Sequence, residues 1–318
     1  MRVSPILSFC LMVPVCGGWL LLASPGSAAA EEGASWQSCV AEAMAPDARV
    51  TACSAVIDGK TETGKRLAAA YCNRGHGLTE QRELDRALAD LDEAVRLDPA
   101  YPCAYSNRGR VYAFKRDLDR AIKDYDEAIR LDPAFALAYN NRGDAWLGKG
   151  DPKRAMADFD AAIRSDPDLA IAYGNRGYLY YRMHDFSHAI QDYSHQIKLK
   201  PDVLAYINRG NAFRDSDQLD RAIDDFTEVI TLAPTDARGW RNRGVIRLFK
   251  GDDKGGLADY DKALQFDPAD AYSWNNRGMA KKRLGDKKGA IADFRKALAL
   301  QPNLRSARES LQALGKKL

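Results

Sequence analysis

One tripeptide recurs along most of this 318-residue chain and constrains its fold more than any other feature. Asn-Arg-Gly occurs seven times, beginning at Asn73, Asn107, Asn141, Asn175, Asn208, Asn242 and Asn276. Successive copies lie 34 residues apart, with a single interval of 33 between Asn175 and Asn208. A fixed period of this length is typical of solenoids, in which each unit buries its apolar side against its neighbours. The sequence therefore predicts an array of stacked repeats.

The same frame of residues surrounds each tripeptide. In the second unit Tyr105 precedes it, and Ala121, Tyr125 and Pro133 follow. The sixth unit keeps this frame, with Gly256 in place of the alanine. The frame resembles the tetratricopeptide repeat, a helix–turn–helix unit of this length. The resemblance covers residues 68–304. It implies an all-α, right-handed superhelical solenoid of antiparallel helix pairs that binds other proteins.

The repeats divide the chain into segments. We predict a degenerate N-terminal helical hairpin or cap at 31–67, seven repeats at 68–304 and a C-terminal solvating helix at 305–318. Each repeat is expected to end near a proline, which cannot continue a helix: Pro99, Pro133, Pro167, Pro201, Pro234, Pro268 and Pro302. Glycine inside a helix costs about 1 kcal/mol relative to alanine. Its return in every tripeptide predicts a close helix crossing that leaves no room for a Cβ.

Residues 1–30 differ from the rest of the chain and resemble a secretory signal peptide. Arg2 is their only charged residue, residues 6–23 are mostly apolar, and 27–30 offer a small-residue cleavage site near Ala30. The alternative is an uncleaved membrane anchor, because the apolar run is long. Pro14 and the glycines at 17 and 18 interrupt that run and favour cleavage. We therefore expect a periplasmic or secreted protein that is not stably inserted in a membrane.

Export makes the cysteines candidates for disulfides. Two short helices are expected at 35–44 and 48–57, with Asp47 as the N-cap of the second. Cys39 and Cys53 lie seven residues on either side of Pro46, so a helical hairpin would place them opposite each other. We predict a Cys39–Cys53 disulfide, with free buried thiols as the alternative. Whether Cys72 and Cys103 also pair is open, because helix spacing exceeds the usual disulfide reach.

An aspartate follows every tripeptide arginine by sixteen residues, from Arg74 with Asp90 to Arg277 with Asp293. An arginine fork at the seam of a helical hairpin needs an acceptor, and a carboxylate can accept two hydrogen bonds from it. We interpret these pairs as ion pairs within repeats. They belong to the architecture and not to catalysis.

The tripeptide asparagines are the main candidates for binding. In the resembled family this position faces the concave groove, and a row of amides suits the backbone of an extended peptide. The row Asn73, Asn107, Asn141, Asn175, Asn208, Asn242 and Asn276 is similar to the asparagine ladder of the O-linked N-acetylglucosamine transferase repeats, which holds peptides. The alternative is that these amides bond to neighbouring helices and stabilise the stacking.

Other groove positions vary between repeats, which is where specificity is expected. The middle of the stripe is apolar and its C-terminal part is basic. The apolar candidates are Leu137, Leu147, Ile171, Tyr178, Tyr181, Leu204 and Ile207, of which Leu137 and Leu204 are expected to pack between repeats. The basic candidates are Arg214, Arg238, Arg241, Lys282 and Arg283. We therefore predict a polypeptide ligand with hydrophobic anchors and an acidic end.

Other function classes find little support. The formal net charge of +3 is too small to indicate nucleic-acid binding. His184, His188 and His195 could suggest a metal, but they occupy positions filled elsewhere by surface Arg and Glu, so we expect a solvated face. There is no phosphate loop, nucleophile elbow or HExxH motif. We expect no enzyme activity, cofactor or metal.

The sequence thus predicts a protein-interaction scaffold or adaptor outside the cytoplasm, which binds a polypeptide in a groove. The alternatives are a structural protein that self-associates through its groove or end helix and, less favoured, an unrecognised enzyme.

Overall fold

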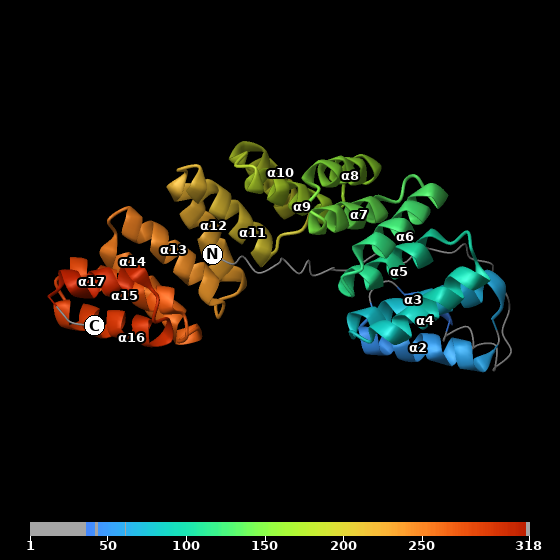
Figure 1. Ribbon diagram of the computed structural model, residues 1–318, viewed down its shortest axis with the longest axis horizontal. Coiled ribbons are helices and arrows are strands. Elements are labelled where there is room, and N and C mark those ends of the chain that lie inside the picture. Colours follow the sequence, from blue (N-terminus) through green and yellow to red (C-terminus); the bar gives the residue numbers. More distant parts are fainter. Residues whose placement is uncertain (1–35, 42–43, 61, 316–318) are drawn as a thin grey trace. The chain divides into compact units, whose positions relative to one another are not determined.

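The computed structural model describes residues 36–41, 44–60 and 62–315, and all regular secondary structure in these ranges is helical. Figure 1 shows the helices α2 to α17 following one another in chain order. Their bounds are α2 Pro46–Gly59, α3 Gly64–Glu80, α4 Leu84–Leu97, α5 Pro102–Phe114, α6 Leu118–Leu131, α7 Ala136–Gly148, α8 Pro152–Ser165, α9 Ala170–Arg182, α10 Phe186–Leu199, α11 Val203–Asp215, α12 Leu219–Leu232, α13 Ala237–Phe249, α14 Asp253–Phe266, α15 Ala271–Arg283, α16 Lys287–Leu300 and α17 Arg305–Ala313.

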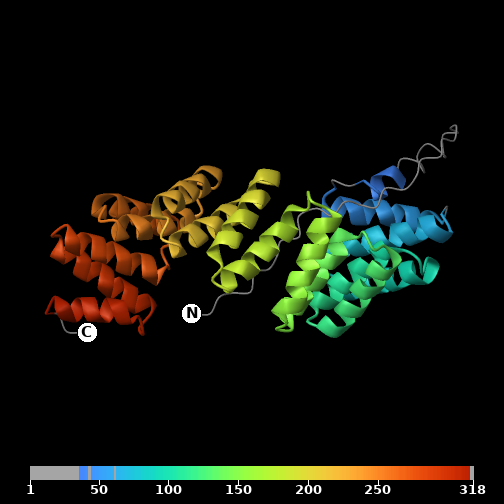
Figure 2. The same cartoon turned by 90° about the horizontal axis from the view of Figure 1, so that it is seen from above.

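The helices form two compact units, which meet within α9, between Ala172 and Tyr173. Figure 2 shows short turns connecting the helices, so consecutive helices run back on one another as antiparallel pairs. We number the repeats from α3/α4, the first, to α15/α16, the seventh. The predicted all-α arrangement of antiparallel helix pairs is confirmed. The division into an N-terminal and a C-terminal unit was not predicted.

The tripeptide glycines lie where the two helices of a repeat cross most closely. A Cβ added at Gly143 would be 2.7 Å from Cε1 of Phe159, and one at Gly109 would be 2.8 Å from Cε1 of Tyr125. The crossing in the sixth repeat is looser, because a Cβ added at Gly244 would be 3.2 Å from the nearest atom, Cβ of Asp259. The aromatic partner is fully buried in the second and third repeats. The close crossing expected from these glycines is therefore confirmed, and it offsets their cost in helix propensity.

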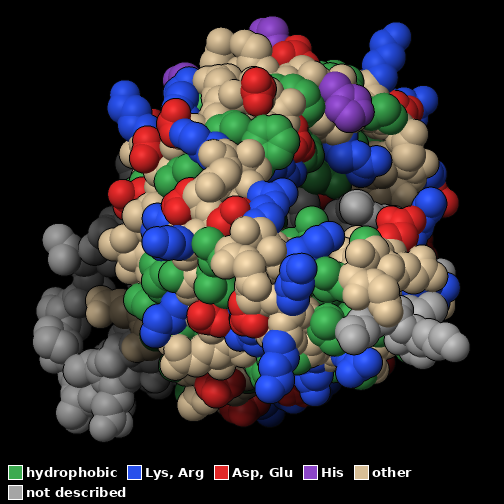
Figure 3. All heavy atoms as spheres, turned by 90° about the vertical axis from the view of Figure 1, so that its left-hand side faces the viewer, with side chains coloured by type: hydrophobic (Ala, Val, Ile, Leu, Met, Phe, Trp, Pro, Cys, Tyr) green, Lys and Arg blue, Asp and Glu red, His purple; other side chains and the backbone are tan. Residues whose placement is uncertain are grey.

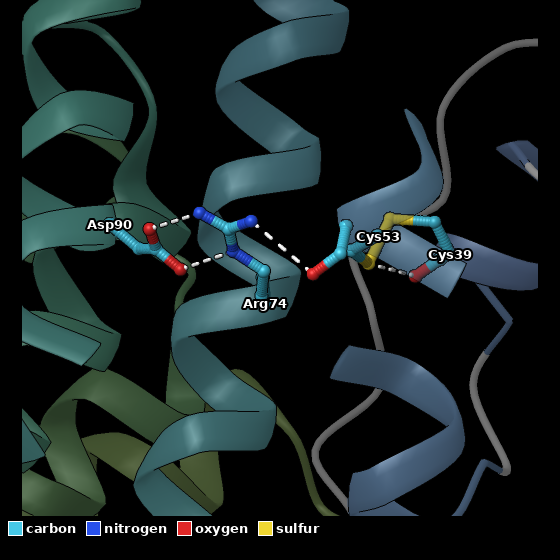
Figure 4. Close-up of a disulfide and its surroundings, with 5 residues drawn as sticks. Cys39, Cys53, Arg74 and Asp90 are labelled. Carbon is cyan, nitrogen blue, oxygen red and sulfur yellow. Dashed lines mark hydrogen bonds and ion pairs between the residues drawn. A yellow bond between two sulfur atoms is a disulfide. The ribbon is translucent and has the colours of Figure 1, made fainter. Parts of the chain in front are cut away.

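All seven predicted arginine–aspartate pairs form within repeats. In each, the guanidinium donates Nε and one terminal nitrogen to both oxygens of a buried carboxylate, at 2.6 to 3.0 Å. The other terminal nitrogen of Arg108 donates to Asp92 of the preceding repeat at 2.8 Å. In the first repeat Arg74 reaches Ser54 of α2 instead (Figure 4). The same arginine thus holds a repeat together and ties it to its predecessor.

The N-terminal hairpin is stapled by the predicted disulfide between Cys39 and Cys53, which is drawn in Figure 4. Both cysteines are fully buried against α3 residues such as Ala70. The local helices differ from the prediction. The first ends at residue 39 instead of 44, and α2 starts at Pro46, so Asp47 lies in the first helical turn and is not the N-cap. Proline suits this first position because it has no backbone N–H, and an N–H there would lack a partner within the helix.

Two further expectations concern cysteine and membrane insertion. Cys72 is a free, buried thiol, so no disulfide joins it to Cys103. The expected signal peptide, residues 1–30, lies outside the described residues. Within the described part of the chain, none of the helices combines the length and apolar character needed to cross a bilayer.

Candidate functional site

The first helices of neighbouring repeats lie side by side. In the N-terminal unit α3 contacts α5 and α5 contacts α7, and in the C-terminal unit α13 contacts α15. Every tripeptide asparagine is on one of these first helices. Because the offset within the repeat is the same, the asparagines occupy equivalent positions on these helices. The exposed side of the first helices, here called the first-helix face, is the candidate binding surface.

The asparagines differ in what they contact. The amide of Asn73 is buried, and its nitrogen has no hydrogen-bond partner. Asn107 donates to Sγ of Cys72 at 3.3 Å, and Asn276 donates to the Tyr260 hydroxyl at 3.1 Å. Asn208 and Asn242 are half-buried and make no side-chain hydrogen bond to the described residues. The predicted row therefore contains amides that hydrogen-bond inside the protein, a buried amide nitrogen without a partner at Asn73, and two amides without a side-chain hydrogen bond to the described residues.

Asn141 and Asn175 complete this row, and both are half-buried. Asn141 accepts a hydrogen bond from the amide of its neighbour Asn140 at 3.3 Å. The seventh repeat has the same arrangement, where Asn275 donates to Asn276 at 3.0 Å. The residue before the tripeptide thus hydrogen-bonds to the tripeptide asparagine in these two repeats, which the sequence pattern did not predict.

The apolar candidates also divide into buried and accessible side chains. Leu137 and Ile207 are buried, at 9% and 8% exposure, so they pack between helices. Leu204 was also expected to pack between repeats, but it is 41% exposed, like Tyr272 at the equivalent position of the seventh repeat, which is 48% exposed. The remaining members, Leu147, Ile171, Tyr178 and Tyr181, are half-buried.

The two tyrosines carry polar contacts. The Tyr181 hydroxyl donates to Asp215 at 2.5 Å, and Arg182 donates to the Tyr178 hydroxyl at 3.1 Å. Burial, and then the hydrogen bond to Asp215, raise the pKa of Tyr181 to about 12. Tyr181 therefore stays a neutral donor at physiological pH. Tyr178 and Tyr181 present rings of mixed apolar and polar character on the first-helix face.

Most of the basic candidates already have carboxylate partners. Each predicted arginine pairs with one aspartate: Arg214 with Asp215, Arg238 with Asp236, Arg241 with Asp270 and Arg283 with Asp253, at 2.6 to 3.3 Å. Lys282 is the one member of this set without a carboxylate partner among the described residues. These contacts cancel much of the positive charge that the sequence pattern indicated. They weaken the reason for expecting an acidic end on the ligand.

A buried polar cluster on α3 and α5 was not anticipated from the sequence. Nδ1 of His76 accepts a hydrogen bond from Arg110 at 2.8 Å, and both side chains are buried. Arginine can only donate, so the proton of the neutral ring is on Nε2, 3.6 Å from Glu80. Burial, and then the charges of Arg110 and Arg49, lower the pKa of His76 well below its usual value. His76 and Arg110 lie three residues after the tripeptide asparagines Asn73 and Asn107, so they occupy equivalent positions in adjacent repeats. This shared position is the sequence signal from which their contact could have been predicted.

This cluster predicts that the N-terminal repeats lose stability in mild acid. The unfolded chain takes up a proton at His76 near pH 6.5, whereas the folded chain does so only at lower pH. Stability is therefore fully present above pH 6.5 and falls below it by up to about 1.4 kcal/mol per pH unit. We expect His76→Gln to remove this part of the pH dependence in urea unfolding followed by circular dichroism. The exposed His195→Gln is the control, and equal slopes in wild type and His76→Gln would contradict the assignment.

The histidines considered as metal ligands lie elsewhere. His184, His188 and His195 are exposed, and Nδ1 of His188 is 2.7 Å from Asp185. The His195 ring stacks on Tyr173 with centroids 5.2 Å apart. In the described residues no group of three or more His, Cys, Asp or Glu side chains is placed to hold a metal ion.

Profiles of the tetratricopeptide repeat match the chain at 72–133, 106–170 and 207–271, and related profiles of the same repeat match at 170–203 and 271–304. The chain belongs to the tetratricopeptide repeat (TPR) family. No curated protein matches this TPR sequence.

Several solved structures share the TPR fold at low sequence identity. Cut9 in the APC/C hetero-tetramer Cut9–Hcn1 has a TM-score of 0.60 at 15% identity, over 85% of this chain and 53% of that one. The chain thus spans about half the length of Cut9. PilF of Pseudomonas aeruginosa has a TM-score of 0.59 at 19% identity, and the match covers 68% of this chain and 98% of PilF. The C-terminal part of a TPR protein from Cytophaga hutchinsonii has a TM-score of 0.59 at 21% identity, over 76% and 99%. These likenesses concern the fold.

Proposed function

We propose that this TPR protein is a non-catalytic scaffold that binds a polypeptide on the first-helix face, outside the cytoplasm. The observation that carries the proposal is the state of Asn208 and Asn242. These two amides occupy equivalent positions in adjacent repeats and make no side-chain hydrogen bond to the described residues. Each offers one donor and one acceptor, which suits the main chain of an extended peptide.

Neighbouring side chains would supply the anchors for such a peptide. Tyr178 and Tyr181 are half-buried, and Leu204 is 41% exposed on the same helix as Asn208. Tyrosine gives a large contact area with little loss of conformational entropy. We therefore propose a ligand with apolar side chains flanking a stretch of main chain that bonds to the amides. An acidic end is not required, because the nearby arginines are paired.

Two observations support a binding role outside the cytoplasm. The buried Cys39–Cys53 disulfide is typical of oxidising compartments. It agrees with the export signal expected at residues 1–30.

TPR proteins of similar fold include Cut9 in its complex with Hcn1 and PilW, which is described as a type IV pilus biogenesis factor. Such roles in assembly are compatible with a scaffold.

The proposal can be tested with peptides selected from a random display library on the immobilised protein. Synthetic versions of the selected peptides are titrated by fluorescence anisotropy. We expect Asn208→Ala/Asn242→Ala to weaken binding roughly tenfold to a hundredfold, because two hydrogen bonds are lost. Asn303→Ala, an exposed asparagine in the turn before α17, is the matched control and should leave binding unchanged.

Two outcomes would contradict this function. One is that no library peptide binds, and the other is that the control weakens binding as much as the double variant. Sedimentation of the same variants measures self-association. If Asn208→Ala/Asn242→Ala dissociates an oligomer, the surface serves assembly of this protein with itself.

A further inference from the structure

The turns of the sixth and seventh repeats expose large apolar side chains at their tips. Phe249, the last residue of α13, is 76% exposed, more than any other large hydrophobic residue in the described part of the chain. Leu284, which caps α15, is 41% exposed. Arg283 donates to the carbonyl oxygen of Leu248 at 2.7 Å and to Asp253 at 3.1 Å, so the two turns are adjacent.

The same turns carry lysines that no carboxylate neutralises. Lys254, Lys282, Lys287 and Lys288 have no ion-pair partner in the described residues. Of the nearby aspartates, Asp253 pairs with Arg283, whereas Asp286 caps α16 by accepting from the backbone N–H of Gly289 and keeps its negative charge. We call the six residues Phe249, Lys254, Lys282, Leu284, Lys287 and Lys288 the basic turn pair.

The corresponding turns in the N-terminal unit differ in their aromatic residue. Phe114, which corresponds to Phe249, is half-buried beneath the guanidinium of Arg82. The lysines that follow the first helices pair alike in both units, because Lys115 contacts Asp85 and Lys250 contacts Asp220. The exposed ring is therefore a feature of the sixth repeat and not of the TPR frame.

Charge increases toward the C-terminal end of the chain. From Lys281 to Gly315 there are nine Lys and Arg residues and three Asp and Glu residues. The acids are occupied, since Asp293 is buried between Arg277 and Lys281, and Glu309 pairs with Arg305. Figure 3 looks at this end of the C-terminal unit, where basic, acidic and apolar side chains are intermixed over the face.

We propose that the basic turn pair binds the surface of an anionic lipid membrane, with Phe249 and Leu284 entering the headgroup region. A ring at the tip of a turn, 76% exposed, needs either a pocket in a partner or a soft apolar interface. Two separate apolar tips flanked by lysines fit a membrane interface better than a pocket, because apolar residues insert there and each lysine is attracted by anionic headgroups.

Nucleic acid is the less suitable polyanion for this surface. Sequence-independent binding to nucleic acid typically combines arginine forks on phosphates with stacking aromatic residues. All four unpaired cations here are lysines, and the one arginine between the turns, Arg283, is held by Leu248 and Asp253. Five residues of the basic turn pair lie outside the predicted groove residues and only Lys282 is shared, so Phe249→Ser tests the membrane contact separately from peptide binding on the first-helix face.

The experiment measures co-sedimentation of the protein, recovered after export of the full chain, with lipid vesicles. Equimolar phosphatidylcholine and phosphatidylglycerol vesicles are compared with pure phosphatidylcholine. We expect binding to the anionic vesicles that weakens strongly at ~0.5 M NaCl, where screening is short-ranged. Binding to the neutral vesicles measures what the apolar side chains contribute without anionic headgroups, and we expect it to be weak.

Variants separate the basic turn pair from bulk charge. Lys282→Gln/Lys287→Gln/Lys288→Gln is expected to reduce the partition into anionic vesicles roughly 100-fold, at about fivefold per lysine. Phe249→Ser is expected to reduce it roughly tenfold. The matched control, Lys123→Gln/Lys198→Gln/Lys262→Gln, removes the same charge from exposed positions within second helices and should change binding less than threefold. Circular dichroism verifies that each variant is folded.

Three results would overturn the proposal. The first is no binding to anionic vesicles at low salt, and the second is an equal loss in both triple variants. The third is binding to a fluorescent DNA duplex or a polyglutamate peptide that depends on the turn lysines, without any vesicle binding. That result would make the surface a site for a soluble polyanion.

Discussion

Replacing Asp259 with asparagine is expected to lower the free energy of unfolding of the C-terminal repeats by about 3 to 5 kcal/mol. Asp259 is 1% exposed and accepts hydrogen bonds from two arginines. Arg243 donates to it at 3.0 and 2.8 Å, and Arg247 donates at 2.9 Å. An amide in this place leaves Arg243 without a carboxylate partner and Arg247 with only Asp252, 3.8 Å away, and it points its own N–H groups at a guanidinium.

Asp261→Asn is the matched control, because Asp261 lies two residues away on the same helix, α14. Its carboxylate also accepts from an arginine, Arg277, at 2.8 Å, but its side chain is 56% exposed. The expected loss is at most about 1 kcal/mol, since water screens an exposed pair. Urea unfolding followed by circular dichroism measures both variants. Similar losses in the two would show that burial of the Asp259 pair does not set its importance.

Removal of the Cys39–Cys53 disulfide is expected to destabilise the N-terminal cap by about 3 kcal/mol. The bond closes a loop with a sequence separation of 14, and the constraint acts mainly by reducing the entropy of the unfolded chain. Cys39→Ser/Cys53→Ser also places two hydroxyls where the sulfurs are fully buried. Because α2 packs on α3 and Arg74 reaches Ser54, the loss should extend into the first repeat.

The measurement combines urea unfolding with hydrogen exchange of the α3 and α15 amides. Exchange should accelerate in α3 and stay unchanged in α15, because each repeat depends mainly on its immediate neighbours. Cys72→Ala is the control, since this thiol is free and burial raises its pKa to about 11, which keeps it protonated. A double serine variant that is as stable as Cys72→Ala would contradict a stabilising role for the disulfide.

The sequence predicted those contacts that every repeat makes in the same way. The Arg–Asp pairs at a separation of sixteen and the close crossings at glycines such as Gly143 recur at fixed offsets, so each copy supports the others. The Cys39–Cys53 disulfide followed from the symmetry of the hairpin about Pro46. The N-cap at Asp47 was wrong because proline can itself begin the helix.

The binding surface could be predicted only in part. The first helices carry the asparagines as expected, but their surroundings differ. Asn73 is buried, Asn276 donates a hydrogen bond to Tyr260, and Asn208 is half-buried without a side-chain hydrogen bond to the described residues. The positive charge expected from Arg214 and Arg241 is largely cancelled by aspartates. These aspartates occupy positions that vary between repeats, so the periodic pattern did not reveal the partners.

By itself, the sequence determined the repeat period, the alternation of helices and the ion pairs inside each repeat. These features depend on residues that are close in the chain and recur in register. Only the tertiary structure decided which amides have hydrogen-bond partners and that Arg110 of the second repeat donates to His76 of the first. It also decided that Phe249 is exposed while Phe114 is half-buried. The physical reason is that burial and partner choice depend on non-repeating side chains brought together across a whole repeat length.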